Sequence, residues 1–117
     1  MSRAAPKPLI TYPALVGKVI AHTREQLGVK QGEFAQRLGS SQSAYSKLES
    51  GDSVINLTQL HRICEKLGIQ PSALLKRADE YEKQLRKSGV EIVSSKEDNT
   101  AAILIGIAFL GALLLGR

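Results

Sequence analysis

The sequence has one cysteine and two histidines among its 117 residues. Cys64 has no second cysteine to pair with, which excludes a disulfide framework within one chain and predicts a reducing compartment. His22 and His61 lack partner ligands at the spacing that zinc requires, so we expect no metal site. No nucleophile–base arrangement and no glycine-rich phosphate loop occurs. The sequence therefore predicts neither an enzyme nor a bound cofactor.

The first residues also lack the features of a secretory signal. Residues 1–13 contain three prolines and no apolar segment, so we expect a flexible arm over residues 1–12 and no export signal there. The length leaves room for one small domain with appendages rather than for two full cores. No internal repeat is visible, and residues 90–93 are the one place where a strand is suggested.

Charge is unevenly distributed along the chain, whose net charge is +5. Residues 1–78 contain eleven Lys or Arg and five Asp or Glu, whereas residues 79–99 contain four basic and six acidic residues. A basic globular part indicates a polyanionic partner, either nucleic acid or an anionic membrane face.

Apolar residues recur at helical spacing in five short segments that glycines separate. Pro13 and Pro71 suit first turns, and Ser41 and Asn56 suit N-caps. The predicted helices cover residues 13–27, 31–38, 42–50, 57–67 and 71–78, and residues 79–87 can extend the last. We therefore expect an all-α fold with one domain over residues 13–87. A polar linker over 88–100 and a separate apolar helix in residues 101–117 are expected to follow.

A pattern spread over about residues 16–78 is more specific than any short motif. Its residues are Gly17, Ile20, Arg24, Gly28, Gln31, Glu33, Phe34, Ala35, Leu38, Gly39, Gln42, Ser46, Leu48, Glu49, Gly51, Leu57, Leu60, Ile63, Leu67 and Gly68. The pattern resembles the Cro/CI-type helix-turn-helix family, also called the xenobiotic-response-element family, which has the lambda-repressor-like fold. The resemblance implies a five-helix domain that binds double-stranded DNA, as a homodimer because one such domain reads a half-site.

Residues 31–50 also fit two steeply crossing helices on physical grounds alone. Ala35 supplies a small side chain at the crossing, and Gly39 permits a sharp turn. Four residues then point inward, namely Phe34, Leu38, Tyr45 and Leu48. Four polar residues are left on the outer face, namely Gln42, Ser43, Ser46 and Lys47.

The resemblance gives these polar residues specific roles. The base-reading residues would be Gln42, Ser43, Ser46 and Lys47, of which glutamine can bond adenine and lysine guanine. The phosphate contacts would be Lys30, Gln31, Ser50 and Asn56, and Gln31 would also brace Gln42. Arg24 and Glu49 would form a structural ion pair between the first and third helices.

Residues 101–116 form an uncharged, mostly apolar run. As a helix they would be about 24 Å long, against a hydrocarbon core of roughly 30 Å. Because the run is apolar all round, we interpret it as a membrane anchor that holds the basic domain at the cytoplasmic face, with one pass through the membrane. The alternative is a helix buried in an oligomer or in a partner's groove.

The leading hypothesis is a sequence-specific DNA-binding transcription regulator, a repressor by analogy, tethered to the membrane through residues 101–116. One alternative is a membrane-anchored helix-turn-helix protein that docks a cytoplasmic protein without binding DNA. A second alternative is an antitoxin-like protein whose apolar tail neutralises a toxin.

Overall fold

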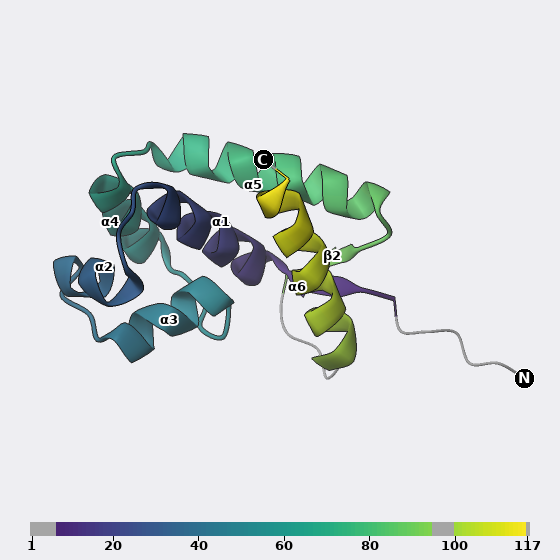
Figure 1. Cartoon of the computed structure of the whole chain (residues 1–117), viewed down its shortest axis with the longest axis horizontal. Coiled ribbons are helices and arrows are strands. Elements are labelled where there is room, and N and C mark those ends of the chain that lie inside the picture. Colours follow the sequence, from purple (N-terminus) through teal and green to yellow (C-terminus); the bar gives the residue numbers. More distant parts are fainter. Residues whose placement is uncertain (1–6, 95–99, 117) are drawn as a thin grey trace, which may run out of the picture.

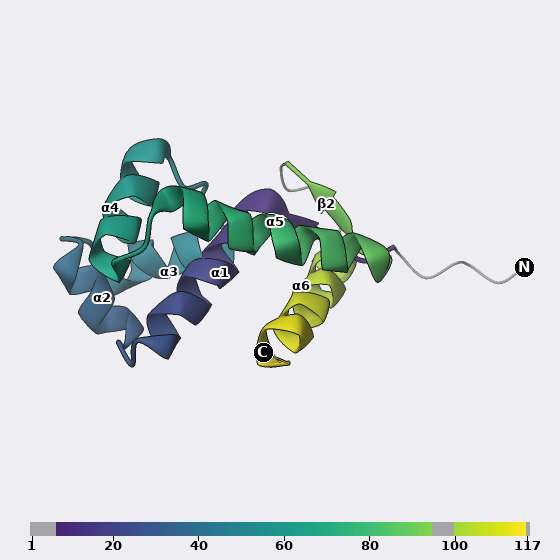
Figure 2. The same cartoon turned by 90° about the horizontal axis from the view of Figure 1, so that it is seen from above.

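The computed structural model describes residues 7–94 and 100–116. Its elements in chain order are β1 (Leu9–Thr11), α1 (Tyr12–Gln26), α2 (Gln31–Arg37), α3 (Gln42–Ser50), α4 (Leu57–Leu67), α5 (Pro71–Lys87), β2 (Glu91–Val93) and α6 (Thr100–Leu115). Figures 1 and 2 show α2, α3 and α4 gathered with α1 toward one end of the long axis. The long helix α5 leads from this group to the other end, where β1, β2 and α6 lie.

Local chemistry sets the helix ends. The Thr11 hydroxyl accepts a hydrogen bond from the Ala14 amide over 3.2 Å, and Ser41 caps α3 in the same way over 3.1 Å. Asn56 and Gln59 form a capping box at the start of α4, with bonds of 2.7 and 2.9 Å. Such bonds satisfy amides that have no partner within the helix. Because these signals are local, α1 to α4 begin and end within one residue of the predicted boundaries, and α5 includes the extension over residues 79–87.

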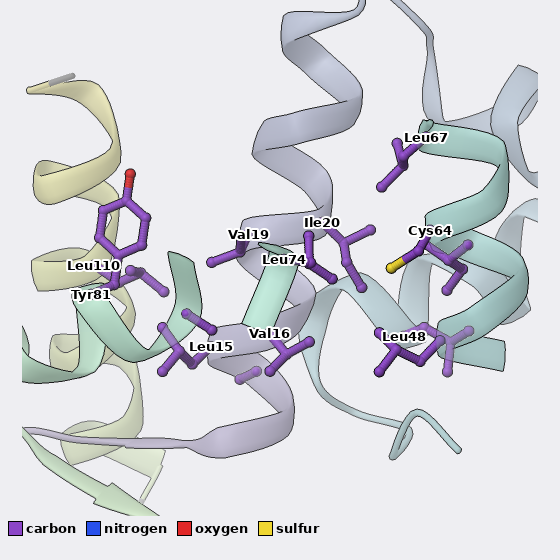
Figure 3. Close-up of a cluster of buried hydrophobic side chains, with 14 of the residues drawn as sticks. Leu15, Val16, Val19, Ile20, Leu48, Cys64, Leu67, Leu74, Tyr81 and Leu110 are labelled. Carbon is purple, nitrogen blue, oxygen red and sulfur yellow. The ribbon is translucent and has the colours of Figure 1, made fainter. Parts of the chain in front are cut away.

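The core is built from buried side chains of all five helices α1 to α5, together with residues of β1 and α6. Figure 3 shows the side chains of Leu15, Val16, Val19 and Ile20 on α1 facing those of α4 and α5. α5 buries a stripe of four residues along its length, namely Leu74, Ala78, Tyr81 and Leu85. Cys64 is buried on the apolar face of α4, and burial raises the pKa of its thiol. The cysteine is therefore a small core residue.

Two short strands correct the predicted arm and linker. β1 lies within residues 1–12 and β2 within residues 88–100, and they pair in parallel with Leu9 opposite Glu91 and Thr11 opposite Val93. The whole helical domain connects the two strands, since parallel neighbours need a long crossover. Residues 1–6 and 95–99, which complete the predicted arm and linker, lie outside the described residues.

α6 is not the separate helix that the sequence predicted. It lies against β1 and also contacts α5 and α1. Three residues at intervals of four form its buried face, namely Ala102, Gly106 and Leu110. In Figure 3, Leu110 lies next to Tyr81 of α5. The helix is therefore packed on the domain, whereas the sequence predicted it to be separate from the domain.

The predicted membrane anchor over residues 101–116 is not supported. Within residues 7–94 and 100–116, no helix has both the length and the apolar character needed for a membrane span. α6 has 16 residues. At 1.5 Å per residue it is about 24 Å long, short of the roughly 30 Å hydrocarbon core. The expected placement at the membrane face depended on this anchor and is not supported either.

Gly106→Ala is expected to displace α6 from β1. A Cβ on Gly106 would overlap the carbonyl oxygen of Leu9 and come within 3.2 Å of the Ile10 amide nitrogen. Because the obstacle is backbone, no side-chain rotation relieves it, and overpacking of this kind costs about 1–3 kcal/mol. Thermal unfolding and limited proteolysis of the α6 segment would show a lower melting temperature and faster cleavage.

Gly111→Ala is the matched control, since a Cβ there meets no atom within 4 Å. It should keep or raise the melting temperature, because alanine is favoured over glycine inside helices by roughly 0.5–1 kcal/mol. Equal melting temperatures for the two variants would contradict the close packing of α6 on β1.

Candidate nucleic-acid interface

α3 rests on α1 and α2 with its apolar side and leaves its polar side open. Tyr45 and Leu48 are buried behind it, and the Tyr45 ring packs on Phe34 with centroids 5.3 Å apart. The four predicted base-reading residues therefore share the outer side of α3. Gln42, Ser43 and Lys47 are exposed there, and Ser46 is half-buried.

A small residue lets α3 approach α1 closely. Ala35, which the sequence analysis placed at the crossing of α2 and α3, is buried. The structure adds Gly17, whose missing side chain admits the end of α3. A Cβ on Gly17 would lie 2.5 Å from the carbonyl oxygens of Leu48 and Glu49. The sequence signal for this role is a glycine inside a helix, which is unfavourable unless close packing requires it.

A buried ion pair joins α1 to the end of α3. The Arg24 guanidinium donates to both carboxylate oxygens of Glu49, from Nε over 2.8 Å and from Nη2 over 3.0 Å. Its Nη1 donates to the carbonyl oxygen of Val29 over 2.7 Å. Arg24 is 7% exposed and Glu49 5% exposed, so the pair is almost completely shielded from solvent. The bidentate geometry fixes the orientation of α3 relative to α1.

The ion pair continues through two amides to the start of α3. Gln31 Nε2 donates to Glu49 Oε1 over 2.9 Å. Gln42 Nε2 in turn donates to Gln31 Oε1 at 3.5 Å, the long limit for such a bond. Gln31 is half-buried and directed to this network, so the structure brings it together with Gln42 and Glu49. The exposed Gln42 amide is thereby connected to a buried charge.

The network shifts the pKa values of its members. Burial alone would raise the pKa of Glu49, but the hydrogen bonds from Arg24, and then the one from Gln31, hold it below its ordinary value. The hydrogen bond to Glu49 raises the pKa of Arg24 despite burial. Burial, followed by the Glu49 carboxylate, raises the pKa of Tyr45, whose hydroxyl reaches hydrogen-bond geometry with neither charged group. Glu49 and Arg24 are therefore both charged at neutral pH.

Gly32 gives the Gln42 side chain its space. A Cβ on Gly32 would lie 3.0 Å from Gln42 Oε1. From the sequence this glycine only weakens the first turn of α2. In the structure it lies where the first residue of α3 folds back over α2.

The remaining predicted phosphate contacts are in different environments. Lys30 and Asn56 are exposed, but Asn56 Oδ1 already accepts the Gln59 amide hydrogen of the capping box. The Ser50 hydroxyl lies between the Lys47 carbonyl oxygen and the Asp52 carboxylate, at 3.2 and 3.0 Å. Among the four predicted phosphate contacts, Lys30 is therefore the one with a positive charge, and its side chain is exposed.

A shallow depression of about 480 Å³ beside α3 contains polar residues that the sequence analysis did not assign to DNA contacts. Ser40, Ser41 and Ser53 line it together with the predicted Ser43 and Lys47. Ser53 comes from the loop after α3, and its amide donates to the Lys47 carbonyl oxygen over 3.0 Å. No short motif marks this serine, because its place depends on how the loop folds back.

Comparison with known proteins identifies this arrangement. Residues 20–74 match the helix-turn-helix family. Residues 20–74 form a Cro/CI-type helix-turn-helix domain. Among solved structures, the domain is similar to the clp gene regulator ClgR from C. glutamicum, with a TM-score of 0.57 and 25% sequence identity. The similarity covers 59% of this chain and 90% of that one. No curated protein matches the sequence.

Within the helix-turn-helix domain, α2 and α3 are the two crossing helices and α3 is the one whose polar side is open. α6 lies outside the matched residues.

Proposed function

We propose that the chain is a sequence-specific DNA-binding transcription regulator that reads double-stranded DNA with α3 and acts as a homodimer. The observation that carries the proposal is the exposed polar side of α3, held from behind by the buried Arg24–Glu49 pair and linked to it through Gln31 and Gln42. A base reader must be held in one orientation to discriminate between bases, and this network supplies that constraint.

Several further features support the proposal. Residues 1–78 have twice as many basic as acidic residues. Two of the acidic side chains are neutralised within the domain, since Glu33 pairs with Arg37 and Glu49 with Arg24. Duplex DNA attracts such a surface through its phosphates. Repression, rather than activation, is proposed by analogy with phage repressors.

In the proposed complex, Gln42, Ser43, Ser46 and Lys47 contact base edges in the major groove. Lys30 contacts phosphate, while Gln31 braces Gln42 and approaches the same backbone. Ser50 and Asn56 would contact phosphate through the hydrogen-bonding positions that their partners within the domain do not occupy. Glutamine suits adenine and lysine suits guanine, so the preferred site should contain both bases.

The test is DNA binding by the full chain and by single variants. Preferred sites are first selected from a randomised duplex library, and affinity is then measured on a preferred and on an unrelated duplex at several salt concentrations. Gln42→Ala should lose about 1–3 kcal/mol on the preferred duplex alone, because one bidentate base contact is removed. Lys30→Ala should weaken both duplexes alike and lower the salt slope by about one.

Lys47→Ala distinguishes a base contact from a phosphate contact, because only the loss of a base contact changes which duplex sites are selected. Equal losses for Gln42→Ala on both duplexes would refute base reading. If the wild-type chain is not retained on duplex DNA even at low salt, the helix-turn-helix domain serves a protein partner instead.

A further inference from the structure

α6 presents an apolar face that the rest of the described chain leaves uncovered. This α6 outer face consists of Leu104, Ile105, Ala108, Phe109, Ala112 and Leu115. Leu104 is 62% exposed and Leu115 89% exposed. Only seven large apolar residues in the described part of the chain are exposed, and four of them lie on this one face. Such a concentration marks an interaction surface rather than ordinary scatter.

The face is presented on a fixed support. On its opposite side, Ala102, Gly106 and Leu110 are buried against β1 and the end of α5. Gly106 allows the helix to touch the β1 backbone directly. In Figure 1, α6 lies on the far side of α1 from α2 and α3, and Figure 2 agrees. A partner on the α6 outer face would therefore leave the polar side of α3 open.

The chemistry of the α6 outer face favours a second copy of the same face as its partner. The described side chains of α6 carry no charge, so a copy of the face placed opposite itself meets neither repulsion nor a charge that would lose its hydration. Large and small residues alternate along it, with Leu104 and Phe109 beside Ala108 and Ala112, so two copies can interdigitate. Isologous interfaces require this self-complementarity, because both partners contribute the same surface.

A lipid surface suits the face less well. Helices that lie in a membrane interface combine an apolar face with a polar face rich in lysine and arginine. The residues of α6 that flank its outer face are apolar as well, namely Ile103, Ile107, Leu113 and Leu114. α6 is also too short to span.

We infer that the α6 outer face is the surface through which two copies of this chain associate. The inference rests on the proposed function in one respect, namely that a half-site reader needs a second copy to read a full site. It places the two-fold axis near the centre of α6, close to Ala108. The sheet and α5 would then hold the two α3 helices apart, one on each side of the axis.

Sedimentation equilibrium of the full chain, in the absence of DNA, tests the inference. The wild type should associate as a dimer in the micromolar range. Leu104→Glu combined with Phe109→Glu should raise the dissociation constant about 100-fold or more, because like charges would face each other across the axis. Val54→Glu combined with Leu57→Glu is the matched control, since both residues are highly exposed but lie off α6. The control should remain a dimer.

A crosslinking experiment decides the matter if the charged variant fails to fold. Ala108→Cys should give a covalent dimer with a short bis-maleimide, whereas Leu57→Cys should not. The wild type is the blank, because Cys64 is buried. A wild type that stays monomeric, a charged variant that still dimerises, or equal crosslinking at both positions would overturn the inference. So would wild-type binding to anionic vesicles that the charged variant has lost.

The two proposals fail in different ways. Loss of duplex binding in every assay with an intact α6 dimer would refute the proposed function alone. A charged α6 variant that still dimerises and still binds the preferred duplex would refute the α6 interface alone.

Discussion

Glu49→Ala should lower the free energy of unfolding by about 3–5 kcal/mol, because it leaves the Arg24 guanidinium buried without its carboxylate. Arg24 is 7% exposed, so water cannot replace the lost partner without opening the contact of α1 with α3. Gln31 loses its acceptor in the same step. Urea unfolding monitored by helix content measures the loss.

The double variant Arg24→Met with Glu49→Leu separates stability from orientation. Replacing both charges with apolar side chains of similar size removes the unpaired charge, so most of the stability should return. Affinity for the preferred duplex should not return, because Gln31 and Gln42 are no longer held. If the double variant were as unstable as Glu49→Ala, lost packing and not the unpaired charge of Arg24 would explain the loss of stability.

The same pair gives the fold a defined response to acid. The pKa of Glu49 is lowered in the folded state, so its contribution is complete above the ordinary carboxyl pKa of about 4.3 and is lost as the pH falls through the folded value. The wild type should therefore lose stability below about pH 4 more steeply than the double variant.

Gly17→Ala should disturb the position of α3 more than any change on its outer side. The added Cβ would lie 2.5 Å from two backbone carbonyl oxygens, those of Leu48 and Glu49. Neither oxygen can rotate away, so α1 and α3 must move apart and the buried pair must stretch. Overpacking costs about 1–3 kcal/mol, against a helix gain of roughly 1 kcal/mol from alanine. We expect a net loss of stability together with a large loss of affinity for the preferred duplex.

The measurement is urea unfolding in parallel with duplex affinity. Gly111→Ala is again the control, since it makes the same chemical change in a helix where nothing lies within 4 Å. If Gly17→Ala were as stable as the wild type and bound the preferred duplex equally well, the close approach of α1 to α3 would not matter for the site.

The parts of the fold that follow from the sequence are those that nearby residues determine. Ser41 and Asn56 cap the helices that begin directly after them, and Pro71 lies in the first turn of α5. These interactions span three or four residues and need no knowledge of the rest of the chain. The polar outer side of α3 follows from the same periodicity, once Tyr45 and Leu48 are assigned to the core.

Contacts between distant residues could not be predicted in this way. The sequence suggested a strand at residues 90–93, where β2 lies, but the three residues of β1 are too few to produce a recognisable alternation, so the pairing could not be foreseen. The composition of α6 favours burial but does not say against what, because lipid and β1 would both satisfy it. Gly17 and Gly32 are similar cases, since their importance depends on atoms of α3 that approach them only in the folded chain.

The strand pairing also sets the order in which the protein can fold during synthesis. β1 leaves the ribosome about 80 residues before β2, its partner in the register that joins Leu9 to Glu91. Domains fold as their residues emerge, and contacts distant in sequence form later than local ones. The five helices should therefore assemble while the N-terminal strand is still unpaired. The site on α3 would thus be complete before β2 and α6 close over the strand.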